Sequence, residues 1–151
     1  ALDSNQYRSP HKLRWLEALA AMLRDDLQCF PQLALLGDYN IAPDDRDVHD
    51  PAAWKDQILC SEPERAAFRN FLGLGLADAF RLFEQPPKLY SWWDYRQMGF
   101  RLNRGLRIDH VLLSTPLAAA CRACIIDKAP RKLERPSDHA PVMATFDFSS
   151  P

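Results

Sequence analysis

The sequence lacks the features that would mark a membrane-bound, secreted or repetitive protein. Its 151 residues contain no apolar run near the ~20 residues needed to cross a bilayer. No positively charged start precedes an apolar stretch, and no internal repeat or low-complexity tract is present. We therefore expect a cytoplasmic protein without a membrane partner. With 47% hydrophobic and 26% charged residues, there is apolar material for one core and not for two domains.

The sequence also lacks a complete set of zinc ligands and an excess of charge of either sign. Cys121 and Cys124 form a C-x-x-C, but neither Cys29, Cys60 nor a nearby histidine completes a zinc set. Reduced thiols are the simpler expectation. Nineteen Lys and Arg against twenty Asp and Glu leave a net charge of -1, so any surface that binds phosphates must be local.

Two segments carry the pattern of amphipathic helices. Ser9-Pro10 has the residue types of an N-cap and a first helical position, and apolar residues then recur at spacings of three and four over 13–27. Trp15, Leu19 and Met22 widen this apolar face, which suits a helix lying across a sheet. Residues 61–64, Ser-Glu-Pro-Glu, indicate a capping box that opens a second helix.

Three strands and two irregular segments complete the predicted elements. The strands are 33–36, taken as short and buried, 107–114, and 142–148, where apolar residues alternate. Segments 40–51 and 93–106 are rich in charged residues and lie next to strand ends. Loops in such positions usually carry the chemistry.

Asp38 and Asn40 follow the first strand. If the strand stays extended, their side chains point to the same face, where Asp can orient a water and Asn can donate a hydrogen bond. The alternative is a plain turn, which Gly-Asp-Tyr-Asn also favours.

Asp109 and His139 also lie at strand edges. Asp109 begins on the core side of its strand and needs a partner, either an arginine such as Arg104 or Arg107, or His139. Two prolines restrict the backbone around Asp138-His139, so this histidine is either a held acid, base or phosphate donor, or a surface residue in a capped turn.

Four motifs in order, LLGDYNIAP, LYSWWDYR, NRGLRIDHVLLS and PSDHAPV, resemble those of the exonuclease III and apurinic/apyrimidinic endonuclease family. The resemblance implies catalytic roles for Asp38, Asn40, Asp109 and His139. Asp38 would position the attacking water, Asn40 would hold the phosphate, and Asp109 would orient His139. Asp138 and Asp38 would lie at a Mg²⁺ site, with Mn²⁺ as an alternative metal.

The same resemblance implies a DNA-binding surface. Trp92 and Leu106 would line an apolar pocket for a flipped-out abasic sugar, Arg96 would project into the DNA helix, and Arg104 and Arg107 would meet phosphates. The implied partner is double-stranded DNA with abasic sites or 3' ends.

The implied fold is of the α/β (α+β) type, a four-layer α/β sandwich of mostly antiparallel sheets flanked by helices. Residues 1–151 match only its C-terminal half. The N-terminal half, with the main metal-binding Glu, has no counterpart in this sequence, so the fragment itself is expected to be weak or inactive. An unpaired sheet face would favour self-association.

The function implied for the full-length form is a DNA-repair phosphodiesterase, an abasic-site endonuclease and 3'-to-5' exodeoxyribonuclease. A phosphatase or lipid phosphodiesterase on the same fold gives no reason for the WWDYR segment. A catalytically silent module that binds nucleic acid or protein remains the alternative from another class.

Overall fold

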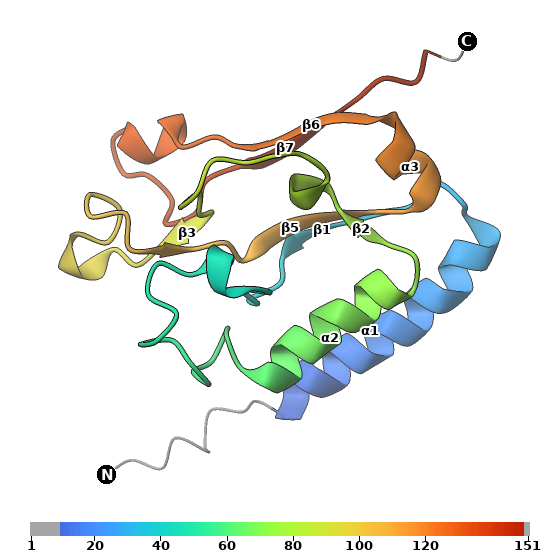
Figure 1. The fold of residues 1–151 in the computed structure, drawn as a ribbon, viewed down its shortest axis with the longest axis horizontal. Coiled ribbons are helices and arrows are strands. Elements are labelled where there is room, and N and C mark those ends of the chain that lie inside the picture. The colour runs from blue at the N-terminus through green and yellow to red at the C-terminus, as the bar shows by residue number, and fades with distance from the viewer. Residues whose placement is uncertain (1–9, 150–151) are drawn as a thin grey trace.

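The computed structural model describes residues 10–149, which form a pair of helices, a three-stranded sheet and a two-stranded sheet, stacked in that order (Figure 1). Every strand pair in these residues is antiparallel. The α/β fold class predicted from the sequence is therefore confirmed. None of the helices within residues 10–149 is long and apolar enough to span a membrane.

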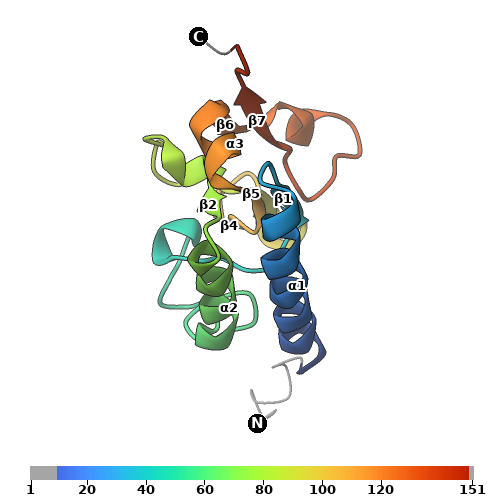
Figure 2. The same cartoon turned by 90° about the vertical axis from the view of Figure 1, so that its right-hand side faces the viewer.

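Helices α1 (Pro10–Cys29) and α2 (Glu62–Gly73) lie side by side against one face of the three-stranded sheet (Figure 2). Leu16 and Leu23 of α1 pack with Phe68 of α2 in one core cluster. Each of these side chains contributes about 1.5–3 kcal/mol when it is fully buried. The first helix is thus confirmed, although its predicted N-cap, Ser9, lies outside the described residues.

The start of α2 shows the predicted capping interaction. The carboxylate of Glu64 accepts hydrogen bonds from the Ser61 backbone N–H at 3.2 Å and from the Ser61 hydroxyl at 2.6 Å. The other side of this carboxylate is paired with Lys12 of α1. The capping residue therefore also ties the two helices together.

The three-stranded sheet has the order β1-β5-β2, with β1 (Ala34–Asp38) at one edge, β5 (Asp109–Leu113) in the centre and β2 (Ala77–Asp78) at the other edge. The prediction that the first strand is buried is wrong, since Leu36 is 67% exposed. Leu35 faces the helices, whereas Leu36 lies on the opposite face, which no described element covers at this edge.

The second sheet covers the other face of β5. It consists of β6 (Cys121–Ile126) and β7 (Val142–Phe146), and helix α3 (Thr115–Ala120) joins β5 to β6 (Figure 1). Alternate residues of β7 are half-buried and exposed, which confirms the predicted alternation. Val111 and Leu113 of β5 form the core between the two sheets.

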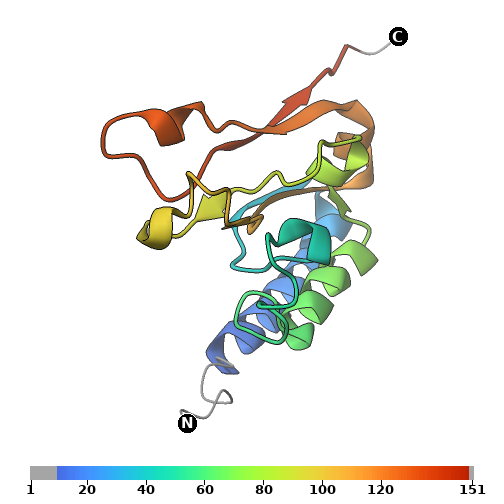
Figure 3. The ribbon, with the colours of Figure 1, turned by 60° about the vertical axis from the view of Figure 1, so that its left-hand side comes forward.

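A small third sheet forms within the predicted irregular segment. Strand β3 (Trp92–Trp93) pairs with β4 (Gly105–Leu106), and the connection between them includes a short 3-10 turn at Arg96–Met98. This connection and the segment between β6 and β7 extend from the same end of the molecule (Figure 3). The Tyr95 hydroxyl joins them by donating to the Pro136 carbonyl at 2.7 Å.

The apolar face of α1 differs from the sequence expectation. Trp15 and Met22 of α1 are 60% and 52% exposed, so they do not widen the buried face of that helix. Leu19, by contrast, is half-buried and packs against the core cluster of the two helices, as expected.

Candidate active site

Asp38 and Asn40 meet through a turn rather than along an extended strand. Strand β1 ends at Asp38, and Asn40 adopts a left-handed backbone conformation, with φ of 52°. Asn tolerates this region better than most residues. The Asn40 backbone N–H donates to Asp38 Oδ1 at 2.8 Å, and the Asn40 side-chain amide donates to Oδ2 at 3.1 Å. The turn interpretation is therefore confirmed, and the catalytic roles of Asp38 and Asn40 stay a prediction.

The register of the sheet brings a second carboxylate to the same place. Asp38 and Asp109 are directly opposed in the β1–β5 pair, so their side chains leave the same face. Burial raises the pKa of Asp109 above its ordinary value, and hydrogen bonds with Ser91 and His139 oppose this shift. The result is two neighbouring acids, of which Asp38 is the more exposed.

His139 is brought to these acids by a segment that pairs with β3. The Ala140 N–H donates to the Ser91 carbonyl at 2.7 Å, and the Trp93 N–H donates to the Asp138 carbonyl at 3.1 Å. Buried Arg131 also donates to the Ser137 carbonyl. His139 thus lies in a segment held on both sides, as the flanking prolines suggested.

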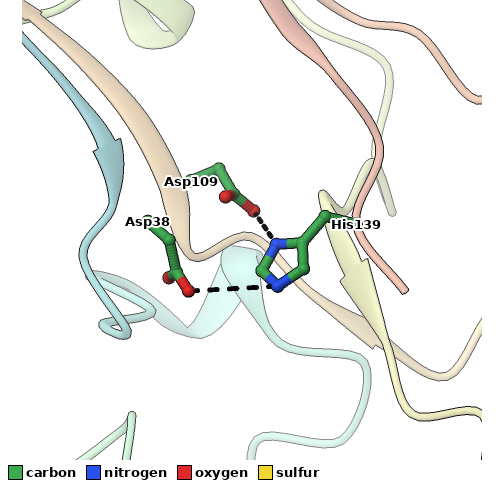
Figure 4. A group of neighbouring side chains, drawn as sticks. All are labelled: Asp38, Asp109 and His139. Carbon is green, nitrogen blue, oxygen red and sulfur yellow. Dashed lines mark hydrogen bonds and ion pairs between the residues drawn. The ribbon is translucent and has the colours of Figure 1, made fainter. Parts of the chain in front are cut away.

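The imidazole of His139 lies between the two carboxylates (Figure 4). Its Nδ1–H donates to Asp109 Oδ2 at 2.8 Å, while Nε2 lies 3.9 Å from Asp38 Oδ2. The distance to Asp38 is too long for a direct hydrogen bond. An oxygen atom placed off the line between Nε2 and Oδ2 can still lie within hydrogen-bond distance of both, because 3.9 Å is less than twice a normal hydrogen-bond length. The expected Asp109–His139 contact is present.

Ligand atoms of Asp38, Asp109 and His139 all lie within 4.8 Å of one another, which makes them a possible metal-binding group. Two carboxylate oxygens suit Mg²⁺, which prefers oxygen ligands and keeps several waters. The third ligand, an imidazole, suits it less, and its Nδ1 is already bonded to Asp109. Of the three, the half-exposed Asp38 fits a Mg²⁺ site best.

Asp138, expected at the metal, lies in different surroundings. Its Oδ2 accepts a hydrogen bond from the Trp92 indole at 3.0 Å, and it is not in the group of possible metal ligands found among residues 10–149. The structure therefore places Asp138 beside the expected sugar pocket. It fixes the orientation of the Trp92 ring.

The two residues expected to line that pocket differ in exposure. Trp92 and Leu106 are opposed in the β3–β4 pair, but Trp92 is half-buried and Leu106 is fully buried, at 0% exposure. Leu106 packs in a core cluster with Ala42 and Ile108. Of these two residues, only Trp92 presents surface to a ligand. The expectation that Leu106 lines the pocket is therefore wrong, and Leu106 instead belongs to the core cluster against which Trp92 packs.

Two of the three expected arginines are at the surface. Arg96 and Arg104 line an open pocket of about 560 Å³ together with Trp92. Arg96 is also paired with Asp94 at 2.9 Å, and this ion pair is largely exposed, so it is weak. Both guanidinium groups can reach a ligand in the pocket that Trp92 borders.

The expectation that Arg107 meets phosphates is wrong. Its guanidinium is buried, with Nε 2.7 Å from Asp47 Oδ1 and Nη2 2.8 Å from Asp78 Oδ2. These two carboxylates raise its pKa further above the ordinary arginine value, against the effect of burial. A side chain held in this way cannot turn toward DNA without leaving both acids unpaired.

No sequence pattern predicted this buried ion cluster. Asp47 lies in a charged loop and Asp78 between two helical segments, and no local spacing connects either residue with Arg107. His110 also contacts the cluster, since its Nδ1 lies 3.0 Å from Arg107 Nη1.

Comparisons with known proteins agree with this geometry. Residues 2–139 match the Endonuclease/Exonuclease/phosphatase family. The chain is similar to exodeoxyribonuclease III of Haemophilus influenzae, with 35% identity over 150 residues that cover 95% of this chain and 56% of that protein.

Two solved structures show the same likeness. A 3' phosphatase from Neisseria bound to a product DNA hairpin superposes with a TM-score of 0.90 and 46% identity, over 93% of this chain and 56% of that one. An AP endonuclease from Archaeoglobus fulgidus gives a TM-score of 0.84 and 36% identity, over 91% and 54%. The chain spans about half the length of the curated relatives it matches.

Proposed function

The chain belongs to the Endonuclease/Exonuclease/phosphatase family, and from this we propose that it is the C-terminal half of a DNA-repair phosphodiesterase. In full-length form this enzyme would cleave at abasic sites and remove nucleotides from 3' ends. The observation that carries the proposal is His139, which is bonded to Asp109 through Nδ1 and has its Nε2 3.9 Å from Asp38 Oδ2. Relatives named as an exodeoxyribonuclease III and an AP endonuclease support the choice of substrate.

The proposed reaction is attack of water on a DNA phosphodiester, in line with the leaving 3' oxygen. Asp38 orients the water and accepts its proton, since its carboxylate is half exposed and faces the open side of the site. His139 binds a phosphate oxygen through Nε2, because Nδ1 is held by Asp109. Asn40 keeps Asp38 in place through two hydrogen bonds and also contacts the phosphate.

Mg²⁺, or Mn²⁺ in its place, would be held by Asp38 and by residues of the N-terminal half, and it would offset the negative charge on the phosphate and leaving oxygen. Asp138 would lie near this metal without binding it. Its carboxylate accepts a hydrogen bond from the Trp92 indole and so orients that ring.

Duplex DNA is the proposed partner, bound along the open pocket beside the site. Trp92 would contact the abasic sugar, while Arg96 would enter the helix and Arg104 would meet a phosphate. These three side chains surround the same pocket, which lies next to His139 through the Trp92–His139 backbone bridge.

The decisive experiment measures Mg²⁺-dependent incision of an abasic duplex by the full-length protein. Asp38→Asn and His139→Ala should each lower kcat by about 10²–10⁴, the usual contribution of a catalytic acid or base. Asp25→Asn, an exposed carboxylate on α1, is the matched control and should leave kcat unchanged. Near-normal rates in both site variants would falsify the assigned roles. Salt-dependent DNA binding without any cleavage would instead support a silent binding module.

We further propose that the isolated 151-residue chain associates with a second copy through the uncovered face near β1. Leu36, Val111 and Val142 line an open groove of about 390 Å³ between β1 and β7. Within residues 10–149 each of these two strands is paired on one side only. Exposed apolar surface beside unpaired strand edges favours association.

Light scattering at micromolar concentration tests this proposal. The wild-type chain should be larger than a monomer, and Leu36→Lys should shift it toward the monomer. Leu133→Lys is the matched control, because Leu133 is equally exposed, at 67%, and lies outside the groove. A clean monomer in the wild type would contradict the proposal.

A further inference from the structure

His110 is a buried histidine directly beside the site that the proposed reaction does not use. Its side chain is 1% exposed and lies edge-on to the rings of Tyr39 and Phe68, with centroids 5.3 and 4.8 Å away. Nδ1 lies 3.0 Å from Arg107 Nη1, and Nε2 lies 2.8 Å from the Ile41 carbonyl oxygen. Both ring nitrogens are therefore in hydrogen-bond contact.

These two contacts define the tautomer of His110. Arginine has only donors, so Nδ1 must be the unprotonated acceptor. A carbonyl oxygen only accepts, so Nε2 must carry the proton that is donated to Ile41. Arg107 in turn is held by Asp47 and Asp78. The imidazole is therefore one end of a series of side chains joined by hydrogen bonds and ion pairs.

This series of hydrogen-bonded side chains ends at the turn that carries Asn40. The Tyr39 N–H donates to the Ile108 carbonyl at 3.0 Å, and the Ile41 carbonyl accepts from His110. Residues on either side of Asp109 thus hold residues on either side of Asn40. Asn40 between them has φ of 52°, a conformation that needs support from its surroundings.

We propose that His110 is a positioning residue that holds Asn40, and through it Asp38, in the geometry required for attack on the phosphate. The inference rests on the proposed function, because it assigns a role in that reaction. His110 touches neither substrate nor metal. It acts by fixing the distance between the Asp38–Asn40 turn and the strand that carries Asp109.

The test is steady-state kinetics of the full-length protein on abasic duplex DNA. His110→Phe keeps the ring shape and removes both hydrogen bonds, while His110→Gln can still donate to Ile41 and accept from Arg107. Since a misplacement near 1 Å costs roughly 10²-fold in rate, His110→Phe should lower kcat by about 10–100-fold with KM nearly unchanged. His110→Gln should recover most of that loss.

Leu23→Ala is the control for lost stability, because Leu23 is buried in the core between the helices and its side chain takes no part in the hydrogen bonds of Arg107 and His110. It should lower the unfolding midpoint without changing kcat at temperatures where the protein is folded. Wild-type kcat in folded His110→Phe would overturn the proposal, as would a His110→Gln variant no better than His110→Phe.

Hydrogen exchange gives a readout that is independent of DNA cleavage. In full-length His110→Phe, the backbone amides of Tyr39 and Asn40 should exchange faster than in wild type, while amides in the middle of α1 stay unchanged. Unchanged exchange at Tyr39 and Asn40 would overturn the proposal. If wild type failed to cleave DNA but this exchange effect appeared, the proposed function would be wrong and the positioning of the turn would still hold.

Discussion

Replacement of Arg107 by methionine should strongly destabilise the protein. The guanidinium is 1% exposed, and its partners Asp47 and Asp78 are 0% and 8% exposed. Arg107→Met removes the cation from both carboxylates, and of the ion pairs that Asp47 makes within residues 10–149 only the one with Arg81 remains. Breaking a buried ion pair from one side costs about 3–5 kcal/mol, because the remaining charge is buried without compensation. A domain of this size has only about 5–15 kcal/mol of stability in total.

Urea unfolding of the 151-residue chain measures this loss. With a slope of about 2 kcal/mol per molar urea, a loss of about 4 kcal/mol lowers the midpoint by about 2 M. Arg104→Met is the matched control, since Arg104 is exposed and a surface change of this kind costs at most about 0.5 kcal/mol.

If Arg107→Met fails to fold, Asp78→Asn provides a milder version of the same test. It neutralises one carboxylate and keeps the pair between Arg107 and Asp47, so the expected loss is about 1–3 kcal/mol. A loss in Arg107→Met no larger than that in Arg104→Met would refute the structural role of the cluster. It would also support the expectation from the sequence that Arg107 contacts DNA phosphates.

Three further outcomes are expected. At pH 8, a thiol reagent should modify exposed Cys29 quickly and Cys60 and Cys124 only after unfolding, because burial raises the pKa of Cys60 to about 11 and that of Cys124 to about 12. Rapid reaction of more than one thiol in the native chain would contradict this. Trp92→Phe should lower stability by about 1–2 kcal/mol, since Asp138 loses the indole donor; an unchanged urea midpoint would show that this bond contributes nothing. In the full-length protein, Arg104→Ala should reduce the slope of log affinity for DNA against log salt by about one unit, and an unaltered slope would remove Arg104 from the phosphate contacts.

The two longer helices and the last strand were predictable because their determinants are local. The spacing of apolar residues over 13–27, the capping box at 61–64 and the alternation after Val142 each depend on neighbours a few residues away. The structure shows all three. The burial of β1 was not predictable from its apolar run, because burial depends on which elements cover each face of the sheet.

The candidate site was predictable as a set of residues and only partly as a geometry. The motifs around Asp38, Asp109 and His139 identified the set, and strand register together with the pairing of β3 brings them within reach of one another. The turn at Asn40 was one of two alternatives that the local residue types allowed, whereas the bond from Trp92 to Asp138 depends on a long-range contact that no spacing reveals.

By itself, the sequence determined the α/β character of the chain, its two longer helices, and the residue types available for phosphate chemistry, since these follow from local periodicity and from motifs. Only the tertiary structure decided which charged residues face solvent and which are buried. Arg104 and Arg107 look equivalent in the sequence, yet one borders the open pocket and the other joins Asp47 to Asp78 inside the protein. The physical reason is that a buried charge requires partners from distant segments, and only the folded chain brings those segments together.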